Sequence, residues 1–192
     1  MKKTFVIASI FGLTALSANS AFAQQAPQSA GSSKTYAEFA IEDFDDIPAD
    51  NGIRLQGSYD IGNDIFVSGY YRRADADNGS DPDSFAVSAG KYFSLGRGLA
   101  DGLSLDLGAT AGRVDFGAAD SSFYGVQANI SQRIDMFEFH AGTRWIDYTD
   151  GDDDLQANIG ARMMLNSQWS VGLDFAETEL GDLWGINARY SF

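Results

Sequence analysis

Hydrophobic and polar residues alternate along most of the chain from residue 35 onward. In residues 155–164, for example, Leu155, Ile159 and Met163 occupy one set of alternate positions, whereas Gln156 and Arg162 occupy the other. Successive side chains of a β-strand point to opposite faces of the sheet. This period of two therefore predicts β-strands that each have one apolar and one polar face.

The alternation divides the chain into ten segments of roughly ten residues. They are 35–44, 52–61, 65–74, 84–95, 103–116, 123–134, 137–148, 155–164, 169–178 and 183–192. A tilted strand of about this length crosses the hydrocarbon core of a membrane. The sequence therefore predicts an all-β fold, a closed antiparallel transmembrane β-barrel with ten strands. Because segment 35–44 alternates least clearly, eight strands are the alternative.

The links between these segments are alternately short and long, as the turns and loops of an outer-membrane barrel are. The long links are 43–51, 75–83, 115–122, 147–154 and 177–182, and they hold 18 of the 27 acidic residues but no Lys or Arg. One rim of the barrel is therefore expected to carry solvated, mutually repelling acidic loops.

A divalent-cation site is the alternative interpretation of one acidic link. Asp150, Asp152, Asp153 and Asp154 lie within five residues, and carboxylates suit calcium or magnesium. The segment lacks the register and the closing Glu of an EF-hand loop. These four residues are therefore weak candidates only, for a metal that bridges the rim to lipopolysaccharide phosphates.

The polar face of the segments carries charges of both signs together with many glycines. The charged residues are Arg54, Asp106, Arg144, Arg162, Asp174 and Arg189, and the glycines are Gly108, Gly125, Gly142, Gly160, Gly172 and Gly185. A narrow barrel is filled by side chains, and an unpaired charge in a confined interior is costly. We therefore expect the inward charges to pair with one another; a selectivity pathway for small ions is the alternative.

Aromatic residues gather at both ends of the apolar face. Tyr59, Phe93, Phe137, Trp169, Tyr190 and Phe192 lie near the short links, and Tyr71, Phe85, Tyr124, Trp145, Phe175 and Trp184 near the long ones. Aromatic girdles of this kind mark the two membrane–water interfaces. They favour a membrane barrel over a soluble periplasmic barrel or sandwich, in which the apolar face would point inward.

The final segment carries Trp184, Ile186, Tyr190 and Phe192 on one face. It resembles the closing strand of Gram-negative outer-membrane β-barrels, and from residue 35 the chain resembles the small barrels that include OmpA and OmpX. The resemblance implies a place in the cell outer membrane after export, among outer-membrane lipid and lipopolysaccharide. It also implies that periplasmic chaperones and the barrel-insertion machinery are partners, and that these four residues form the assembly signal. Those relatives have eight strands, whereas ten are predicted here.

The N-terminal region predicts an export signal. Lys2 and Lys3 precede an apolar stretch that is too short to span a membrane as a helix, and Ala21 and Ala23 form a small-x-small cleavage site. We therefore predict a signal peptide over residues 1–23 rather than a retained helical anchor. A flexible linker over 24–34 and the barrel domain over 35–192 are predicted to follow.

Charge and cysteine content narrow the possible partners. Removal of Lys2 and Lys3 leaves 11 of the 13 basic residues against 27 acidic ones, a formal net charge of −16. That excess of acid argues against a nucleic-acid partner. The chain has no cysteine, so its stability in an oxidising envelope comes from the fold and not from disulfides.

His140, the only histidine, tests the hypothesis of an enzyme. Outer-membrane proteases of the omptin type also have ten strands, with an Asp–His pair at the outer rim. His140 lies three residues into its segment, near a short link, which is the wrong rim for a surface protease or acyltransferase. We expect it to hydrogen-bond an inward carboxylate such as Glu138, and we predict no catalytic residue and no cofactor.

The sequence therefore predicts a non-enzymatic, porin-like outer-membrane barrel with a structural or surface-interaction role. A small ion-conducting channel is the first alternative. An omptin-like or acyltransferase-like enzyme is the second, and the position of His140 disfavours it.

Overall fold

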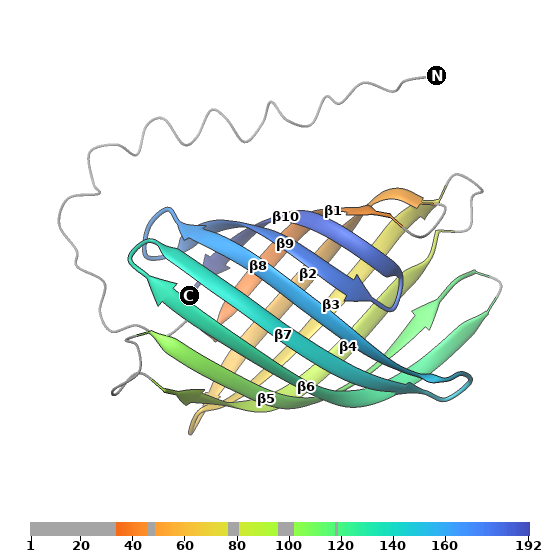
Figure 1. Cartoon of the computed structure of the whole chain (residues 1–192), viewed down its shortest axis with the longest axis horizontal. Coiled ribbons are helices and arrows are strands. Elements are labelled where there is room, and N and C mark those ends of the chain that lie inside the picture. Colours follow the sequence, from red (N-terminus) through yellow and green to blue (C-terminus); the bar gives the residue numbers. More distant parts are fainter. Residues whose placement is uncertain (1–33, 46–48, 77–80, 96–101, 118) are drawn as a thin grey trace, which may run out of the picture.

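The computed structural model describes residues 34–45, 49–76, 81–95, 102–117 and 119–192. Within them, ten antiparallel strands form one closed barrel (Figure 1). The strands are β1 (Tyr36–Phe44), β2 (Ala49–Gly62), β3 (Ile65–Ala76), β4 (Asp83–Ser94), β5 (Leu103–Asp115), β6 (Asp120–Ile134), β7 (Phe137–Tyr148), β8 (Asp153–Met164), β9 (Trp169–Thr178) and β10 (Gly181–Ser191).

The predicted signal peptide and residues 24–33 of the predicted linker lie outside the described residues. In the described part, no helix is long and apolar enough to span a membrane.

The first and last strands close the barrel. β1 pairs with β2 on one side and with β10 on the other, so that Tyr36 lies opposite both Ser58 and Ser191. Every strand then has two hydrogen-bonded neighbours, so that the described sheet closes on itself without a free edge strand. The prediction of ten strands is confirmed, and the alternative of eight is wrong.

Tight turns lie at one end of the barrel. Between β2 and β3, Asn63 and Asp64 have φ values of 58° and 61°. Two successive residues with positive φ give a turn whose twist matches that of the antiparallel strands it joins. Figure 1 shows this turn at the left-hand end, here termed the short-turn end. The right-hand end holds the connections predicted as long links and is termed the long-loop end, although its β9–β10 connection has only two residues.

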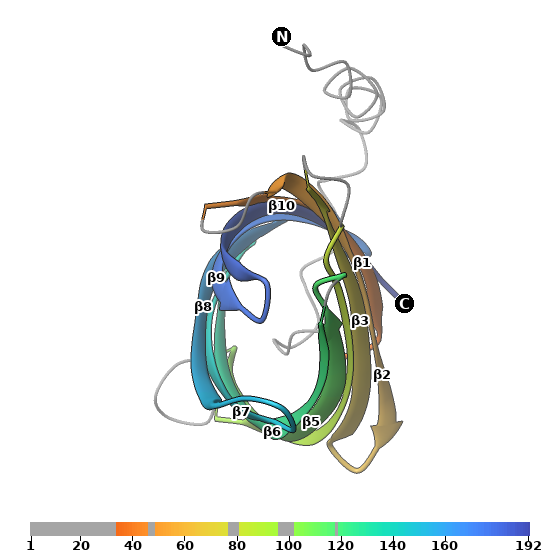
Figure 2. The same cartoon turned by 90° about the vertical axis from the view of Figure 1, so that its right-hand side faces the viewer.

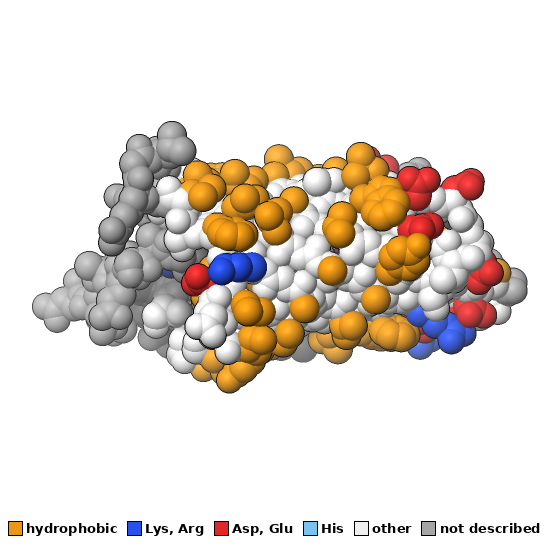
Figure 3. Space-filling view, turned by 90° about the horizontal axis from the view of Figure 1, so that it is seen from below, with side chains coloured by type: hydrophobic (Ala, Val, Ile, Leu, Met, Phe, Trp, Pro, Cys, Tyr) orange, Lys and Arg blue, Asp and Glu red, His pale blue; other side chains and the backbone are white. Residues whose placement is uncertain are grey.

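The outer face of the barrel is apolar. Leu155, Val87 and Ile159 keep 65%, 63% and 60% of their surface exposed, and hydrophobic side chains cover much of the wall in Figure 3. A soluble barrel would bury such side chains, whereas a membrane barrel presents them to lipid. The alternative of a soluble barrel or sandwich is therefore rejected.

The two predicted aromatic girdles lie on this outer face. Eleven of their twelve members are exposed. The twelfth, Tyr190, packs its ring edge-on against Trp169 and Phe192, with both pairs of ring centroids 5.0 Å apart. The apolar belt is thus bounded by aromatic residues at both ends, as expected at membrane interfaces.

Candidate functional site

The lumen holds a network of buried ion pairs. Because side chains alternate along each strand, the polar face of the sequence pattern becomes the inner face of the barrel. Seven strands and one connection contribute to the network, with five arginines and five carboxylates: Arg54, Arg72, Arg144, Arg162, Arg189, Glu38, Glu42, Glu138, Asp174 and Glu179. The prediction that the inward charges pair with one another is confirmed, and the charges of this network balance.

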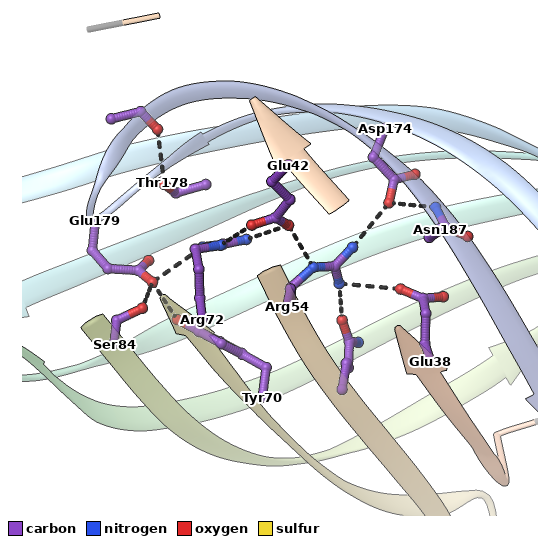
Figure 4. A network of polar contacts seen from close by, with 12 residues as sticks. Glu38, Glu42, Arg54, Tyr70, Arg72, Ser84, Asp174, Thr178, Glu179 and Asn187 are labelled. Atoms are coloured by element: carbon purple, nitrogen blue, oxygen red, sulfur yellow. Dashed lines mark hydrogen bonds and ion pairs between the residues drawn. The ribbon is translucent and has the colours of Figure 1, made fainter. Parts of the chain in front are cut away.

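Two carboxylates of β1 form the centre of the network. Glu38 Oε2 lies 3.0 Å from a guanidinium nitrogen of Arg162 and 2.7 Å from Nε of Arg189. Arg54 contacts Glu38 at 3.1 Å and Glu42 at 2.7 Å (Figure 4). Both carboxylates are almost completely buried, so each depends on these partners to offset the loss of water.

The network continues to the long-loop end through Glu179. Arg72 contacts this carboxylate at 3.1 Å, and the hydroxyls of Ser84 and Tyr70 donate hydrogen bonds to it (Figure 4). Arg144 forms a second ion pair with it. Burial alone would raise the pKa of Glu179, but the Arg144 and Arg72 guanidinium groups and the Ser84 hydroxyl lower it to about 2. The carboxylate is therefore ionised at neutral pH, although its side chain has no exposed surface.

The prediction that the long links form a solvated acidic rim is wrong for Glu179. The connection between β9 and β10 bends inward and places its carboxylate against Arg72 and Arg144. The cations that stabilise Glu179 lie on other strands, more than 30 residues away in the sequence. The link itself contains no Lys or Arg, so its own sequence gives no sign of these partners.

Apolar side chains form two buried clusters, and the first of them includes the residue that follows this carboxylate. Leu180, which is 1% exposed, belongs to a buried cluster with Phe44, Ala74, Val114 and Leu183. A second cluster contains Ala86, Phe123 and Ile146, and Tyr148 packs against both clusters. Figure 2, viewed from the long-loop end, shows the β9–β10 connection inside the mouth of the barrel.

A polar cavity of about 270 Å³ lies within the barrel. Its lining extends from Lys34 to Thr178 and Leu183, and Leu183 belongs to the first of these apolar clusters. Lys34 forms an ion pair with Asp106, on the opposite wall. The cavity therefore runs along the lumen and reaches residues next to the β9–β10 connection.

His140 contacts a different carboxylate from the one predicted. Glu138 binds Arg162 at 2.7 Å, whereas Nε2 of His140 lies 3.1 Å from Oδ1 of Asp174. The register explains the difference, because Gly160 of β8 stands between His140 of β7 and Asp174 of β9. A Cβ atom at Gly160 would overlap both side chains. The imidazole reaches across a strand because that strand has no side chain at this point.

Other acidic loop residues do have cations nearby. Asp81 pairs with Arg73 at 2.6 Å and Asp120 with Arg113 at 2.8 Å. These arginines are strand residues just outside the long links, and exposed pairs of this kind contribute little to stability. The rim is therefore less repulsive than the links alone predict.

The weak metal candidates remain a prediction. Asp153 accepts a hydrogen bond from Trp145 Nε1 at 2.9 Å, and Asp154 accepts one from Gln156 at 2.8 Å. In the part of the chain that the structure describes, no group of three or more His, Asp or Glu residues is placed to hold a metal ion.

The residues of the predicted assembly signal share one face at the end of the chain. Trp184, Ile186 and Phe192 are exposed on the outside of the barrel, and Tyr190 is half-buried between aromatic neighbours. The backbone N–H of Phe192 donates to the carbonyl of Thr35 at 3.1 Å. Their recognition by the insertion machinery remains a prediction.

Four members of the network were missed from the sequence: Glu38, Glu42, Arg72 and Glu179. The signal for the first two was present in β1, where Glu38 and Glu42 alternate with Phe39 and Ile41. Segment 35–44 looked irregular because it has charged residues on its inner face beside Ala40 and Phe44. For Glu179 the sequence held no such signal.

The family model of the outer membrane protein β-barrel domain matches residues 8–192. This chain belongs to that family. The barrel is therefore an outer-membrane protein. Among curated proteins, none matches it.

Solved structures of porins are similar to the chain. Two structures of a KdgM porin, one of them in complex with disordered oligogalacturonate, are each 12% identical to it and cover 82% of this chain and 99% of their own, with TM-scores of 0.49 and 0.50. A mutant of the Rh. blastica porin is 17% identical and covers 74% of this chain and 55% of its own, with a TM-score of 0.30. At these identities the likeness concerns the fold alone.

Proposed function

We propose that this protein is a non-enzymatic barrel of the outer membrane whose lumen is sealed, with a structural or surface-interaction role. The observation that supports the proposal is the burial of Glu179 and Leu180 at the long-loop end. The first is held by two buried ion pairs and the second lies in an apolar cluster. A water-filled pore would instead leave inward side chains exposed at this level.

The electrostatics of the lumen support the same proposal. A selective pore presents one sign of charge along its path, whereas this network holds five charges of each sign in contact with one another. One KdgM porin structure names an oligogalacturonate, a polyanion, as its ligand. The balanced lumen described here offers no continuous positive track for such a molecule.

An enzymatic role has little support from the geometry. His140 and Asp174 form a pair, but both side chains face the lumen cavity and not the outer rim. Asp174 also contacts Arg54 at 3.1 Å. A carboxylate held in this way supports the barrel interior, and a macromolecular substrate outside the cell would not reach it.

A small channel is the second candidate, and the cavity favours it. Polar side chains, among them Asn129, Asn158 and Gln127, line this space of about 270 Å³. Among the described residues, the buried apolar cluster around Leu180 is the barrier that such a channel would have to open. The two candidates differ in one measurable property, the conductance of the native chain.

Planar-bilayer recording of the wild-type protein tests the proposal. A sealed lumen predicts a current that stays at the baseline of the protein-free membrane, with at most brief openings. Folding of the same preparation is checked by its faster migration on a denaturing gel before heating. Steady, long-lived conductance from the folded wild type would contradict the proposal and favour the channel.

A further inference from the structure

The seal at the long-loop end depends on a connection of only two residues. Glu179 and Leu180 join Thr178, the last residue of β9, to Gly181, the first residue of β10. Both are buried, although loop residues normally lie on the surface. Figure 2 shows this connection, here termed the inward turn, within the ring of strands.

The inward turn keeps its shape through local bonds. The Oγ1 of Thr178 accepts a hydrogen bond from the backbone N–H of Leu180 at 3.2 Å and donates one to the carbonyl of Gly181 at 2.8 Å. Gly181 has a φ of 114°, which favours glycine. These bonds lie within residues 178–181, so the turn can keep its shape whether or not it lies in the lumen.

The position of the inward turn depends instead on side chains of other strands. Glu179 is bound by Arg72 of β3, Ser84 of β4 and Arg144 of β7. Leu180 packs in the cluster that includes Ala74. Alanine side chains are small, and β3 also contributes Ala76 at the edge of this cluster. The inward turn fills the space that these short side chains leave in the mouth of the barrel.

The cavity would reach the long-loop end if the inward turn moved outward. Its lining already includes Arg72, Arg144, Thr178 and Leu183, which contact or adjoin the turn. Without Glu179, the five arginines of the network face four carboxylates. The lumen would then carry an excess positive charge at the level of Arg72 and Arg144, which favours anions.

We propose that the inward turn is a gate, and that the lumen conducts small inorganic anions when Glu179 and Leu180 leave it. This inference rests on the proposed function, because a gate requires a lumen that is sealed at rest. It adds an activity, the passage of chloride-sized anions, to the structural role.

Recordings of turn variants in planar bilayers test this proposal. Glu179→Gln removes the charge that Arg72 and Arg144 bind, and Leu180→Ala removes most of the apolar contact while leaving that charge in place. Neither position is in a strand, so the hydrogen-bonded ladder is unchanged. Glu177→Gln is the matched control, since it removes an exposed carboxylate of β9 only two residues away.

The gate predicts a different result for each variant. Glu179→Gln should raise the open fraction at least about tenfold over wild type, because loss of a buried charge partner shifts an equilibrium by more than that factor. Its reversal potential in a potassium chloride gradient should favour chloride. Leu180→Ala should also open the lumen, with a weaker preference for chloride, and Glu177→Gln should behave as wild type.

Folded Glu179→Gln and Leu180→Ala proteins that are as silent as Glu177→Gln would overturn the gate. If Glu179→Gln does not fold, as judged by its migration on an unheated gel, Leu180→Ala decides the question alone. An opened lumen that prefers potassium would overturn the assignment to anions. Steady conductance of the wild type would contradict the sealed lumen itself. This outcome differs from failure of the gate, in which the wild type and both turn variants are silent.

Discussion

At the residue scale, Glu179 is a buried charge that is stabilised only by its partners. Two guanidinium groups and two hydroxyls surround its carboxylate, and its side chain has no exposed surface. Taking a carboxylate out of water is costly unless such partners offset the loss. The same residue therefore holds the inward turn in place and depends on the turn's position for its own stability.

The substitution Glu179→Gln should lower the free energy of unfolding at pH 7 by about 3 kcal/mol or more, because it leaves Arg72 and Arg144 without a buried partner. The pKa of Glu179 is about 2 in the folded protein, below its ordinary value of 4.5. Its stabilisation is therefore complete above about pH 5 and is lost as the pH falls through 4.5 toward 2. The groups that face it do not titrate over this range, because Arg72 and Arg144 stay protonated and charged and Tyr70 stays neutral.

Urea titration in detergent micelles at pH 7 and pH 3 measures this effect. The difference in unfolding free energy between wild type and Glu179→Gln should fall at pH 3 to roughly half of its value at pH 7, or less. Glu177→Gln serves as the control and should show little difference at either pH. An equal difference at both pH values would mean that Glu179 is not held ionised by its surroundings.

At the element scale, the strands were predictable because each has one face in lipid. A period of two appears wherever one face is apolar and the other polar, and all ten predicted segments overlap the observed strands. The pairing of inward charges was predictable as a principle, but the partners were not. Arg162 contacts Glu38, for example, across 124 positions of the sequence, and such a contact depends on the tilt and register of the closed barrel.

The inward course of the β9–β10 connection was not predictable from the pattern. A link with Glu177, Glu179 and Asp182 has the composition of a solvated loop. Its second carboxylate, Glu179, turns into the lumen because Arg72 and Arg144 form ion pairs with it there. Small side chains of the apolar cluster also leave room for the turn. Both conditions belong to other strands, so neither is visible within the link.

The last strand carries a prediction about assembly. Deletion of Phe192 should lower the yield of folded protein in the outer membrane, because it removes the exposed terminal aromatic from the face shared with Trp184 and Ile186. Phe192→Tyr, which keeps an aromatic ring, should retain most of the yield. The measurement is the heat-modifiable fraction in outer-membrane preparations, and an unchanged yield after deletion would count against the assembly role.

At the scale of the whole molecule, charge is sorted by location. The positive and negative charges of the lumen network balance, so the net negative charge of the chain lies outside this network. Figure 3 shows carboxylates at the long-loop end. An apolar belt with aromatic borders separates this end from the short-turn end. The molecule thus has carboxylates at its long-loop end, an apolar wall and a charge-balanced network in its lumen, an arrangement that agrees with the proposed sealed interior.

The position of Leu180 tests the central claim, the sealed lumen, most directly. In a sample with labelled Ala, Leu and Val methyl groups in micelles, nuclear Overhauser effects report which methyls lie close together. An inward turn predicts contacts from the Leu180 methyls to Ala74 of β3 or Val114 of β5, members of its buried cluster on distant strands. A Leu180 whose methyls contact only β9 and β10 would place the turn outside the lumen and contradict the account.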